Sequence, residues 1–272
     1  MIREMQIRNY SQRTIKSYVA SISKLAKFFN LPVEEITISQ LKDYLHHRTT
    51  IEQVSVSMIN QCISAFKIIQ QDVLGRDWEP LKVKRPRREQ KLPVVLSSGE
   101  VAAMISKTKN IKHKALISLA YSTGIRRQEL QLMEAGHIDS KRMQVYVANG
   151  KGKKARYTLL SEKALTLLRD YYRADRPVRY LFEPNGRKGH VLSATTLNNI
   201  IKQAATRAGV TKKVSFHSLR HSFATHLLEK GVNLRIIQQF MGHHSIKTTS
   251  RYLHIARIDP AQVRSPLDDM NL

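Results

Sequence analysis

"SFHSLRHSFATHLLEKG", residues Ser215 to Gly231, combines the spacing of a packed helix with a charge that a packed helix ordinarily lacks. On a wheel of about 3.6 residues per turn, one apolar stripe is formed by Phe216, Leu219, Phe223 and Leu227. Arg220 falls close to the middle of this stripe, and His217 lies at its margin. Because a buried ion costs several kcal/mol unless it is paired, the stretch predicts a helix with a partner group opposite Arg220.

The overall charge indicates the kind of partner. The chain of 272 residues has 46 Lys and Arg against 21 Asp and Glu, a formal net charge of +25. With 42% hydrophobic and 25% charged residues, it can bury a core and is long enough for two ordinary domains. So large an excess favours a polyanionic partner, most commonly duplex nucleic acid, over a soluble protein that is merely basic.

Cysteine usage and hydropathy bear on the compartment. Cys62 is the only cysteine, which excludes an intramolecular disulfide and a thiolate metal cluster. No apolar run approaches the length of a membrane span, and the first ten residues contain no signal-peptide core. We therefore expect a cytoplasmic, nucleoid-associated protein that has no membrane partner.

Residues 1–81 predict a small all-helical domain, because apolar residues recur at helical spacing after Ser11, Ser39 and Ser57. Residues 82–92 predict a basic linker, in which "KVKRPRREQK" has a proline and no periodicity. We interpret this linker as a strap along DNA phosphates rather than a solvated surface run. Its candidate DNA-binding residues are Lys82, Lys84, Arg85, Arg87, Arg88 and Lys91.

Residues 93–272 predict a second, mostly helical domain with a small antiparallel sheet. Ser97 and Glu100 have the spacing of a capping box, and a later helix should end near Gly124. "MQVYVA" and "ARYTLL" alternate like strands on either side of "NGKGKK", which predicts a hairpin with residues 150–154 at its tip. Further helices are expected over about 161–172, 194–208, 215–230, 234–241 and 247–253.

Several cation-rich segments of this second domain supply side chains for phosphate chemistry: Arg126, Lys151, His217, Arg220, His243 and Tyr252. Two guanidinium forks suit the non-bridging oxygens of one phosphodiester. A lysine can protonate an alkoxide leaving group, a histidine can accept a proton, and a tyrosine hydroxyl can attack phosphorus. On this hypothesis a DNA phosphate lies opposite Arg220, and the arginines take the place of a metal ion.

The same segments carry a family resemblance. "TGIRRQEL", "GKGKKAR", "HSLRHSFATHLLEKG" and "MGHHSIKTTSRYLH" resemble, in order and approximate spacing, the boxes of the tyrosine recombinases, the phage integrase family. "YSQRTIKSYVASISKLAKFF" resembles that family's core-binding domain, so the resemblance covers nearly the whole chain. The pattern is most similar to Xer-like and integron-integrase-like members, although the extra segment of integron integrases before the His-x-x-Arg box is absent.

The resemblance implies a two-domain, C-shaped clamp on DNA, a helical core-binding domain joined to a catalytic domain. It implies site-specific recombination at paired inverted-repeat sites, through a 3′-phosphotyrosine intermediate and a Holliday junction. The implied role is that of an integrase or resolvase of a mobile element, or of chromosome or plasmid dimers. The active species would be a homotetramer, or an assembly with a related recombinase, without a cofactor. A tail over about 259–272 would dock on a neighbouring subunit.

The roles of single residues follow from the same match. Arg126 and Arg220 become the phosphate-binding arginines, Lys151 the general acid and Tyr252 the nucleophile. His217 and His243 match the two catalytic imidazole positions, and His217 is the expected acceptor of the phenol proton. Glu129 matches an acidic position that supports the first arginine, and Lys153 is an additional DNA-binding candidate.

Other interpretations stay open at this level. The spacing of His217 and His221 is that of zinc-binding helices, but Arg220 between them would repel a cation, so we expect no metal site. His221 and His226 are then expected to pack or cap, and the surroundings of Tyr252 predict no apolar pocket for its ring. The alternative functions are a DNA-binding-only regulator and a type IB topoisomerase-like enzyme.

The net charge of +25 predicts that DNA affinity weakens steeply with salt, because bound cations release counterions from phosphates. A plot of log affinity against log salt concentration should have a slope on the order of −5 or steeper. Fluorescence anisotropy of labelled duplex over a salt series measures it. A nearly flat plot would show that the basic residues do not face DNA.

Overall fold

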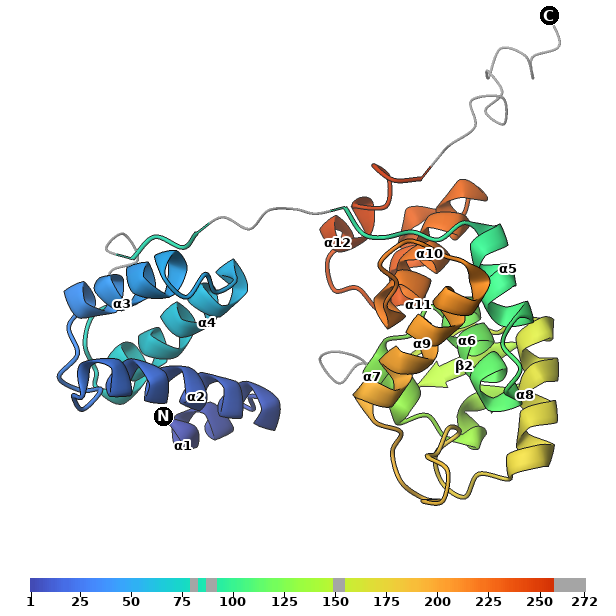
Figure 1. Cartoon of the computed structure of the whole chain (residues 1–272), viewed down its shortest axis with the longest axis horizontal. Helices are drawn as coiled ribbons and strands as arrows, with labels where there is room; N and C mark the ends of the chain where they lie inside the picture. Colours follow the sequence, from blue (N-terminus) through green and yellow to red (C-terminus); the bar gives the residue numbers. More distant parts are fainter. Residues whose placement is uncertain (79–82, 87–91, 149–154, 257–272) are drawn as a thin grey trace, which may run out of the picture. The chain divides into compact units, whose positions relative to one another are not determined.

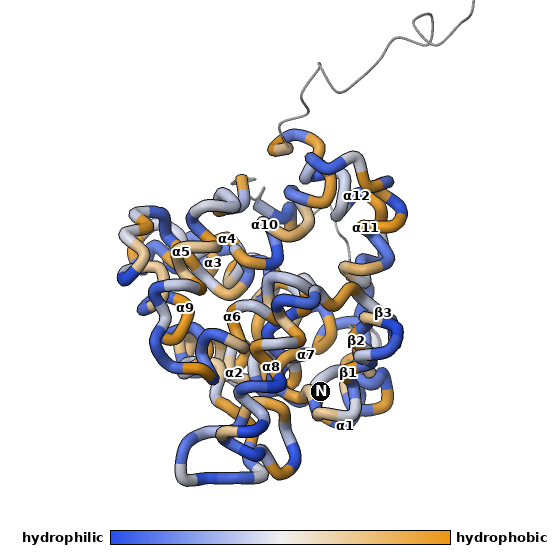
Figure 2. Tube along the Cα trace, turned by 90° about the vertical axis from the view of Figure 1, so that its right-hand side faces the viewer, coloured by the Kyte–Doolittle hydropathy of each residue, from blue (hydrophilic) through white to orange (hydrophobic). Residues whose placement is uncertain are grey.

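A computed structural model of the chain describes residues 1–78, 83–86, 92–148 and 155–256. The chain divides into two compact units, Met1–Lys91 and Leu92–Leu272 (Figure 1). In each unit, polar and apolar positions alternate along the helices, as expected where one helix face is buried (Figure 2). Across the described ranges, no helix combines the length and the hydropathy needed to span a bilayer.

The first unit is helical throughout its described residues. Its elements are α1 (Ile2–Ile7), α2 (Gln12–Phe29), α3 (Ile38–Thr50), α4 (Val56–Lys67) and a π-helical turn (Ile68–Val73). Ser11 caps α2 as predicted, through its side chain and the backbone N–H of Thr14. The next two helices begin earlier than predicted, because Thr37 and Ser55 occupy the N-cap positions in place of Ser39 and Ser57.

The core of this unit lies among α2, α3 and α4 and includes Leu25, Leu41, Ile63 and Phe66. Val83, from the predicted linker, is 6% exposed and belongs to the same core. Arg85 donates to the carbonyl of Asn60 and to Ser64 Oγ in α4, both at 3.1 Å. Residues 83–86 therefore pack on the first unit, with Val83 buried and Lys84 and Arg85 exposed. Lys82, Arg87, Arg88 and Lys91 lie outside the described residues.

The second unit surrounds α6 with helices and a small sheet. The helices are α5 (Ser98–Ser106), α6 (Ile111–Thr123), α7 (Arg127–Gln131), a 3-10 turn (Ala135–His137), α8 (Glu162–Asp175), α9 (Ala194–Ala208), α10 (Phe216–Glu229), α11 (Leu234–Met241) and α12 (Ile246–Ser250). The predicted capping box is present at α5, where Ser97 and Glu100 bond each other's backbone N–H groups. Most predicted helices are confirmed, but α12 ends before Tyr252, and the short α7 has no predicted counterpart.

The sheet confirms the predicted hairpin and adds a strand to it. Strands β1 (Ile138–Asp139), β2 (Gln144–Val147) and β3 (Arg156–Leu159) pair antiparallel in the order β1-β2-β3. Val147 pairs with Arg156, so the two long strands converge on the predicted tip. The tip itself, with Lys151 and Lys153, lies outside the described residues.

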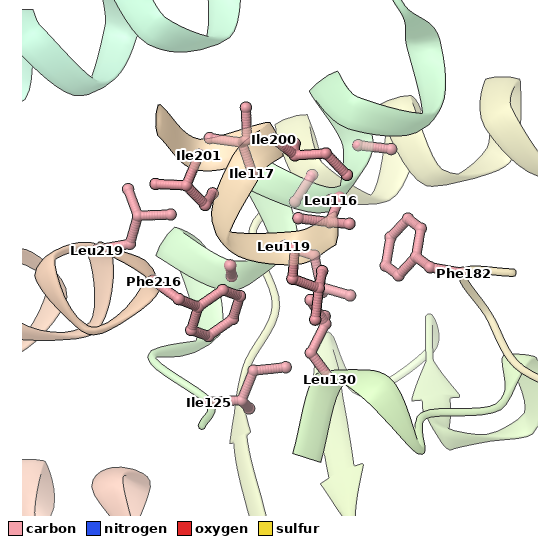
Figure 3. Close-up of a cluster of buried hydrophobic side chains, with 14 of the residues drawn as sticks. Leu116, Ile117, Leu119, Ile125, Leu130, Phe182, Ile200, Ile201, Phe216 and Leu219 are labelled. Atoms are coloured by element: carbon pink, nitrogen blue, oxygen red, sulfur yellow. The ribbon is translucent and has the colours of Figure 1, made fainter. Parts of the chain in front are cut away.

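The core of the second unit is built around α6, which is buried on nearly all sides, including Leu116, Ile117 and Leu119. Phe216 and Leu219, from the start of α10, pack into this core beside α6 (Figure 3). Phe223, from the later part of the predicted apolar stripe of α10, belongs to a second buried cluster with Leu228, Ile237, Met241 and Tyr252. Helix α10 therefore joins the main core to the elements that carry the C-terminal motifs.

Gly124 tests how tightly α6 and α10 are packed. It ends α6 with a φ of 59°, and a Cβ there would lie 2.2 Å from Cδ1 of Phe223. Gly209 ends α9 in a similar conformation, with a φ of 75°, but a Cβ there has nothing within 4 Å. Gly209→Ala should therefore cost only backbone strain, about 1–2 kcal/mol of unfolding free energy.

Gly124→Ala should cost this strain plus the displacement of a buried ring, about 2–5 kcal/mol in all. Urea titrations of both variants, followed by circular dichroism, make the comparison. Equal losses in the two variants would contradict the close packing of α6 against Phe223.

Candidate active site

A pocket of about 310 Å³ opens on the second unit where α10, α12 and the loop after α11 meet. Its lining is Pro93, Arg126, His217, Arg220, His221, Gly242, His243, His244, Ser245, Thr248, Arg251 and Tyr252. This lining has three arginines and four histidines but, among the described residues, no carboxylate. Such a cavity attracts an anion with several oxygens. Across the described ranges, no group of three or more potential metal ligands is found.

The end of α11 organises the arginines. Three successive carbonyls there, of Phe240, Met241 and Gly242, accept hydrogen bonds from Arg156, Arg220 and Arg126 respectively. The last carbonyls of a helix have no partner within the helix, and the helix dipole makes this end negative. Cations from three distant segments are therefore drawn to one helix terminus.

Glu129 is the carboxylate behind this cluster, with a side chain that is 3% exposed. Arg156 binds it with two bonds, of 2.9 and 2.8 Å, and Arg126 adds one of 2.8 Å from its side chain and one of 2.7 Å from its backbone N–H. Burial alone would raise the pKa of Glu129, but the hydrogen bonds and charge of Arg156, and then the hydrogen bonds of Arg126, outweigh it and lower the pKa to about 2. Glu129 thus stays ionised and bonds Arg126, which lines the pocket.

Arg156 is a residue that the sequence reasoning missed. Its side chain is 8% exposed, and it connects β3 to both Glu129 and the end of α11. The only sequence signal is a cation at the start of a predicted strand in "GKGKKAR", and such a cation ordinarily faces solvent. The buried carboxylate that receives it comes from a segment 27 residues earlier.

Arg220 is 4% exposed, as its place on the apolar stripe predicted. Its partners within the protein are the carbonyls of Gly124 and Met241, together with Nε2 of His243 at 3.1 Å. Burial, and then the charge of Arg126, lower the pKa of Arg220. Carbonyl oxygens supply only partial negative charge, so the guanidinium keeps a net attraction for an anion entering the pocket.

His243 is held between two elements. Its Nε2 faces the Arg220 guanidinium and can only accept, so the proton lies on Nδ1, which is 2.9 Å from Thr249 Oγ1. Burial, followed by the charges of Arg220 and Arg126, lowers the pKa of His243 to about 3. This imidazole is therefore neutral, and it lies nearly parallel to the ring of Tyr252, with centroids 6.4 Å apart.

Tyr252 follows α12 in a turn and is 3% exposed. The expectation that its surroundings lack an apolar pocket is wrong, because its ring packs with Phe223, Leu228 and Ile237. Its hydroxyl is 3.0 Å from Nδ1 of His221. Burial raises the pKa of Tyr252, while the charges of Arg220, Arg251 and Arg126 act in the opposite direction.

The three histidines of α10 lie in different surroundings. His217 lines the pocket, where desolvation and then the charge of Arg220 lower its pKa, but the imidazole that lies against the hydroxyl of Tyr252 is that of His221. The expectation that His221 only packs or caps is therefore wrong, because His221 lines the pocket and bonds the hydroxyl of Tyr252. It lies one helical turn after His217 on the same face of α10. His226 does pack, with Nδ1 2.7 Å from the hydroxyl of Tyr121.

Comparison with protein families accounts for both units. Residues 95–257 match the phage integrase family, and residues 1–80 match the phage integrase N-terminal SAM-like domain. A Sinorhizobium fredii protein provisionally named integrase/recombinase is 36% identical over 269 residues, covering 98% of this chain and 87% of that protein. A tyrosine recombinase of Thermosipho africanus is 31% identical over 261 residues, with coverages of 92% and 91%.

The chain therefore belongs to the phage integrase family, and its enzyme class is that of the site-specific tyrosine recombinases. The crystal structure of XerA recombinase is similar, at 29% identity and a TM-score of 0.56, over 93% of this chain and 91% of that one. The structure of a lambda integrase tetramer bound to a Holliday junction shares the fold, at 18% identity and a TM-score of 0.73, over 97% and 77%.

The ionised Glu129 predicts a contribution to stability that depends on pH. Its pKa is lowered from 4.5 to about 2, so this contribution is complete above pH 4.5 and is lost as the pH falls toward 2. It amounts to about 3 kcal/mol. Unfolding free energies of wild type and Glu129→Gln, measured between pH 2 and 6, should converge on acidification.

Glu100 provides a matched control, because it pairs with Lys212 at the surface, at 2.7 Å. Glu100→Gln should leave most of the acid dependence intact, since exposed pairs contribute about 1 kcal/mol or less. A constant difference between wild type and Glu129→Gln at every pH would contradict the coupling of Glu129 to the two arginines.

Proposed function

We propose that this recombinase cuts and rejoins duplex DNA through Tyr252, with Arg126 and Arg220 binding the scissile phosphate. The observation that carries the proposal is the pocket itself, where guanidinium groups and a tyrosine meet and the described lining holds no carboxylate. A phosphodiester presents two anionic oxygens, which suit two guanidiniums held at fixed positions. Their charge stabilises the crowded transition state that a metal ion stabilises in other phosphoryl-transfer sites.

The proposed reaction is a transesterification. Oη of Tyr252 forms a bond to phosphorus, the bond to the 5′ oxygen breaks, and the strand stays attached through a 3′-phosphotyrosine. The phenol proton passes to a histidine of the pocket, for which His217 is the residue expected from the motif, and Lys151 protonates the leaving oxygen. Attack by the 5′ hydroxyl of another strand reverses these steps. Because the phosphotyrosine conserves the bond energy, no cofactor is required.

The partner follows from the same chemistry. Two inverted DNA sites, each bound by two subunits, would form a Holliday junction, as the name of the lambda integrase tetramer structure suggests by analogy. The separation into two units supports a clamp around the duplex, in which the basic residues near 82–91 and Lys153 contact phosphates. Arg85 contributes to this clamp by fixing residues 83–86 on α4.

Two other functions make different predictions. A DNA-binding-only regulator has no use for a tyrosine held in a pocket of arginines. A type IB topoisomerase-like enzyme would relax a supercoiled plasmid that carries no recombination site, whereas a recombinase would exchange strands between two sites. The match of residues 1–80 to the integrase SAM-like domain favours recombination. A relaxation assay beside a two-site recombination assay separates the two enzymes.

Tyr252→Phe should abolish the covalent protein–DNA adduct and leave DNA affinity nearly unchanged, because it removes only the attacking oxygen. The variant should lose about 0.5–1.5 kcal/mol of stability with the hydrogen bond to His221. On a nicked suicide substrate, the wild-type protein should accumulate a denaturant-resistant complex joined through a 3′-phosphate.

Tyr121→Phe is the matched control, since it removes a hydroxyl that bonds a histidine of the same helix outside the pocket. This control should form the adduct at the wild-type rate. Adduct formation by Tyr252→Phe would mean that another residue attacks, and the assignment of the site would have to be rebuilt.

A further inference from the structure

The nucleophile has a contact that the family motif does not assign. Nδ1 of His221 lies 3.0 Å from the hydroxyl of Tyr252, with the ring centroids 5.8 Å apart. Both residues line the phosphate pocket. The hydroxyl is therefore held by α10, the same helix that carries Arg220.

We propose that His221 positions the nucleophile, by accepting the hydroxyl hydrogen of Tyr252 on Nδ1 and so turning the oxygen lone pairs toward the phosphate. The proposal rests on the proposed function, because it concerns the same site. It assigns His221 the orientation of the hydroxyl before attack, and it makes α10 the element that aligns the phosphate-binding arginine with the attacking oxygen.

The charges around the phenol fix the direction of this hydrogen bond. The guanidiniums of Arg220, Arg251 and Arg126 each favour negative charge on Oη. Lone pairs therefore turn toward these cations, and the hydrogen turns away from them toward His221. Burial lowers the pKa of His221 to about 4, and His217, Arg220 and Arg251 act in the same direction, so the imidazole is neutral and offers one lone pair.

Packing fixes the ring of Tyr252, so the remaining motion is rotation of its hydroxyl hydrogen about the C–O bond. Tyr252 is 3% exposed in a buried cluster with Phe223 and Ile237, and its ring lies nearly parallel to that of His243, at an angle of 14°. A ring fixed in this way can still rotate its O–H bond. A single acceptor at Nδ1 selects one rotation, which is the kind of orientation that lowers a barrier before any proton moves.

The two histidines of α10 that line the pocket then have different roles. His217 and His221 are four residues apart and share a helix face, but His217 is exposed whereas His221 is half-buried. The exposed imidazole is placed to meet the incoming phosphate, and the inner one meets the phenol.

Helix α10 also contains an internal control. His226 is half-buried like His221, and its Nδ1 likewise bonds a tyrosine hydroxyl, that of Tyr121, at 2.7 Å. Neither residue of this second pair lines the phosphate pocket. A purely structural effect of losing such a pair should therefore appear equally in His221→Ala and His226→Ala.

The first experiment measures the rate of adduct formation on a nicked suicide substrate, with duplex affinity measured separately. His221→Ala should slow the reaction about tenfold or more and change DNA affinity by less than about twofold. His221→Asn should recover most of the rate, because its amide oxygen can accept near the Nδ1 position. His226→Ala should react at the wild-type rate.

Three outcomes would overturn the proposal: a wild-type rate in His221→Ala, equal losses in the two alanine variants, or His221→Asn as slow as His221→Ala. The last would mean that the imidazole takes the proton. If wild-type protein itself forms no adduct, the proposed function fails, and the positioning role is then judged by a measurement that needs no activity.

That measurement is nitrogen-15 NMR of the histidine side chains in the wild-type, DNA-free protein. His221 should be the Nε2–H tautomer at neutral pH, and its Nδ1 resonance should shift in Tyr252→Phe but not in Tyr121→Phe. A proton on Nδ1 of His221, or an Nδ1 resonance unaffected by Tyr252→Phe, would show that the hydroxyl is not its donor.

Discussion

The attachment of three arginines to the last carbonyls of α11 is the interaction on which the site depends. Arg126 is the N-cap residue of α7, Arg156 begins β3 and Arg220 lies in α10, so elements far apart in the chain meet at one helix end. Like charges would separate if nothing opposed them. The negative end of the helix and the carboxylate of Glu129 hold them together without neutralising them, which leaves positive charge facing the pocket.

The residue that stabilises the arginine cluster is distinct from the residues that line the pocket. Glu129 is enclosed behind Arg126 and Arg156 and does not line the pocket, so it stabilises the fold without adding a negative charge to the pocket lining. The neighbouring imidazoles of His243 and His221 are kept neutral by burial and by the same positive charges. Their hydrogen bonds therefore have a fixed direction at neutral pH. The pocket is organised before a ligand arrives, which reduces the free-energy cost of reorganisation during the reaction.

Local patterns predicted much of this molecule. Helical spacing and cap residues located most helices, and alternation located β2 and β3, because these signals depend on neighbours in the chain. Spacing also marked Arg220 as buried. The contacts of Arg156 and His221 were not predictable from local patterns. Arg156 bonds Glu129 and His221 bonds Tyr252, and both partners lie far away in the sequence. Likewise, the burial of Tyr252 comes from Phe223 and Ile237, which no local pattern connects to it.

Gly242 shows how a residue without a side chain constrains charges on both sides of it. It ends α11 with a φ of 58°, and a Cβ there would lie 2.9 Å from Cδ of Arg156 and 3.0 Å from its Nε and Cζ. Its own carbonyl meanwhile accepts from Arg126. A larger residue would displace the side chain of Arg156, which bonds Phe240 and Glu129, and would strain the backbone whose carbonyl accepts from Arg126. Sequence drift at this position is therefore restricted by the spacing between two guanidiniums, although the residue has no charge or reactive atom of its own.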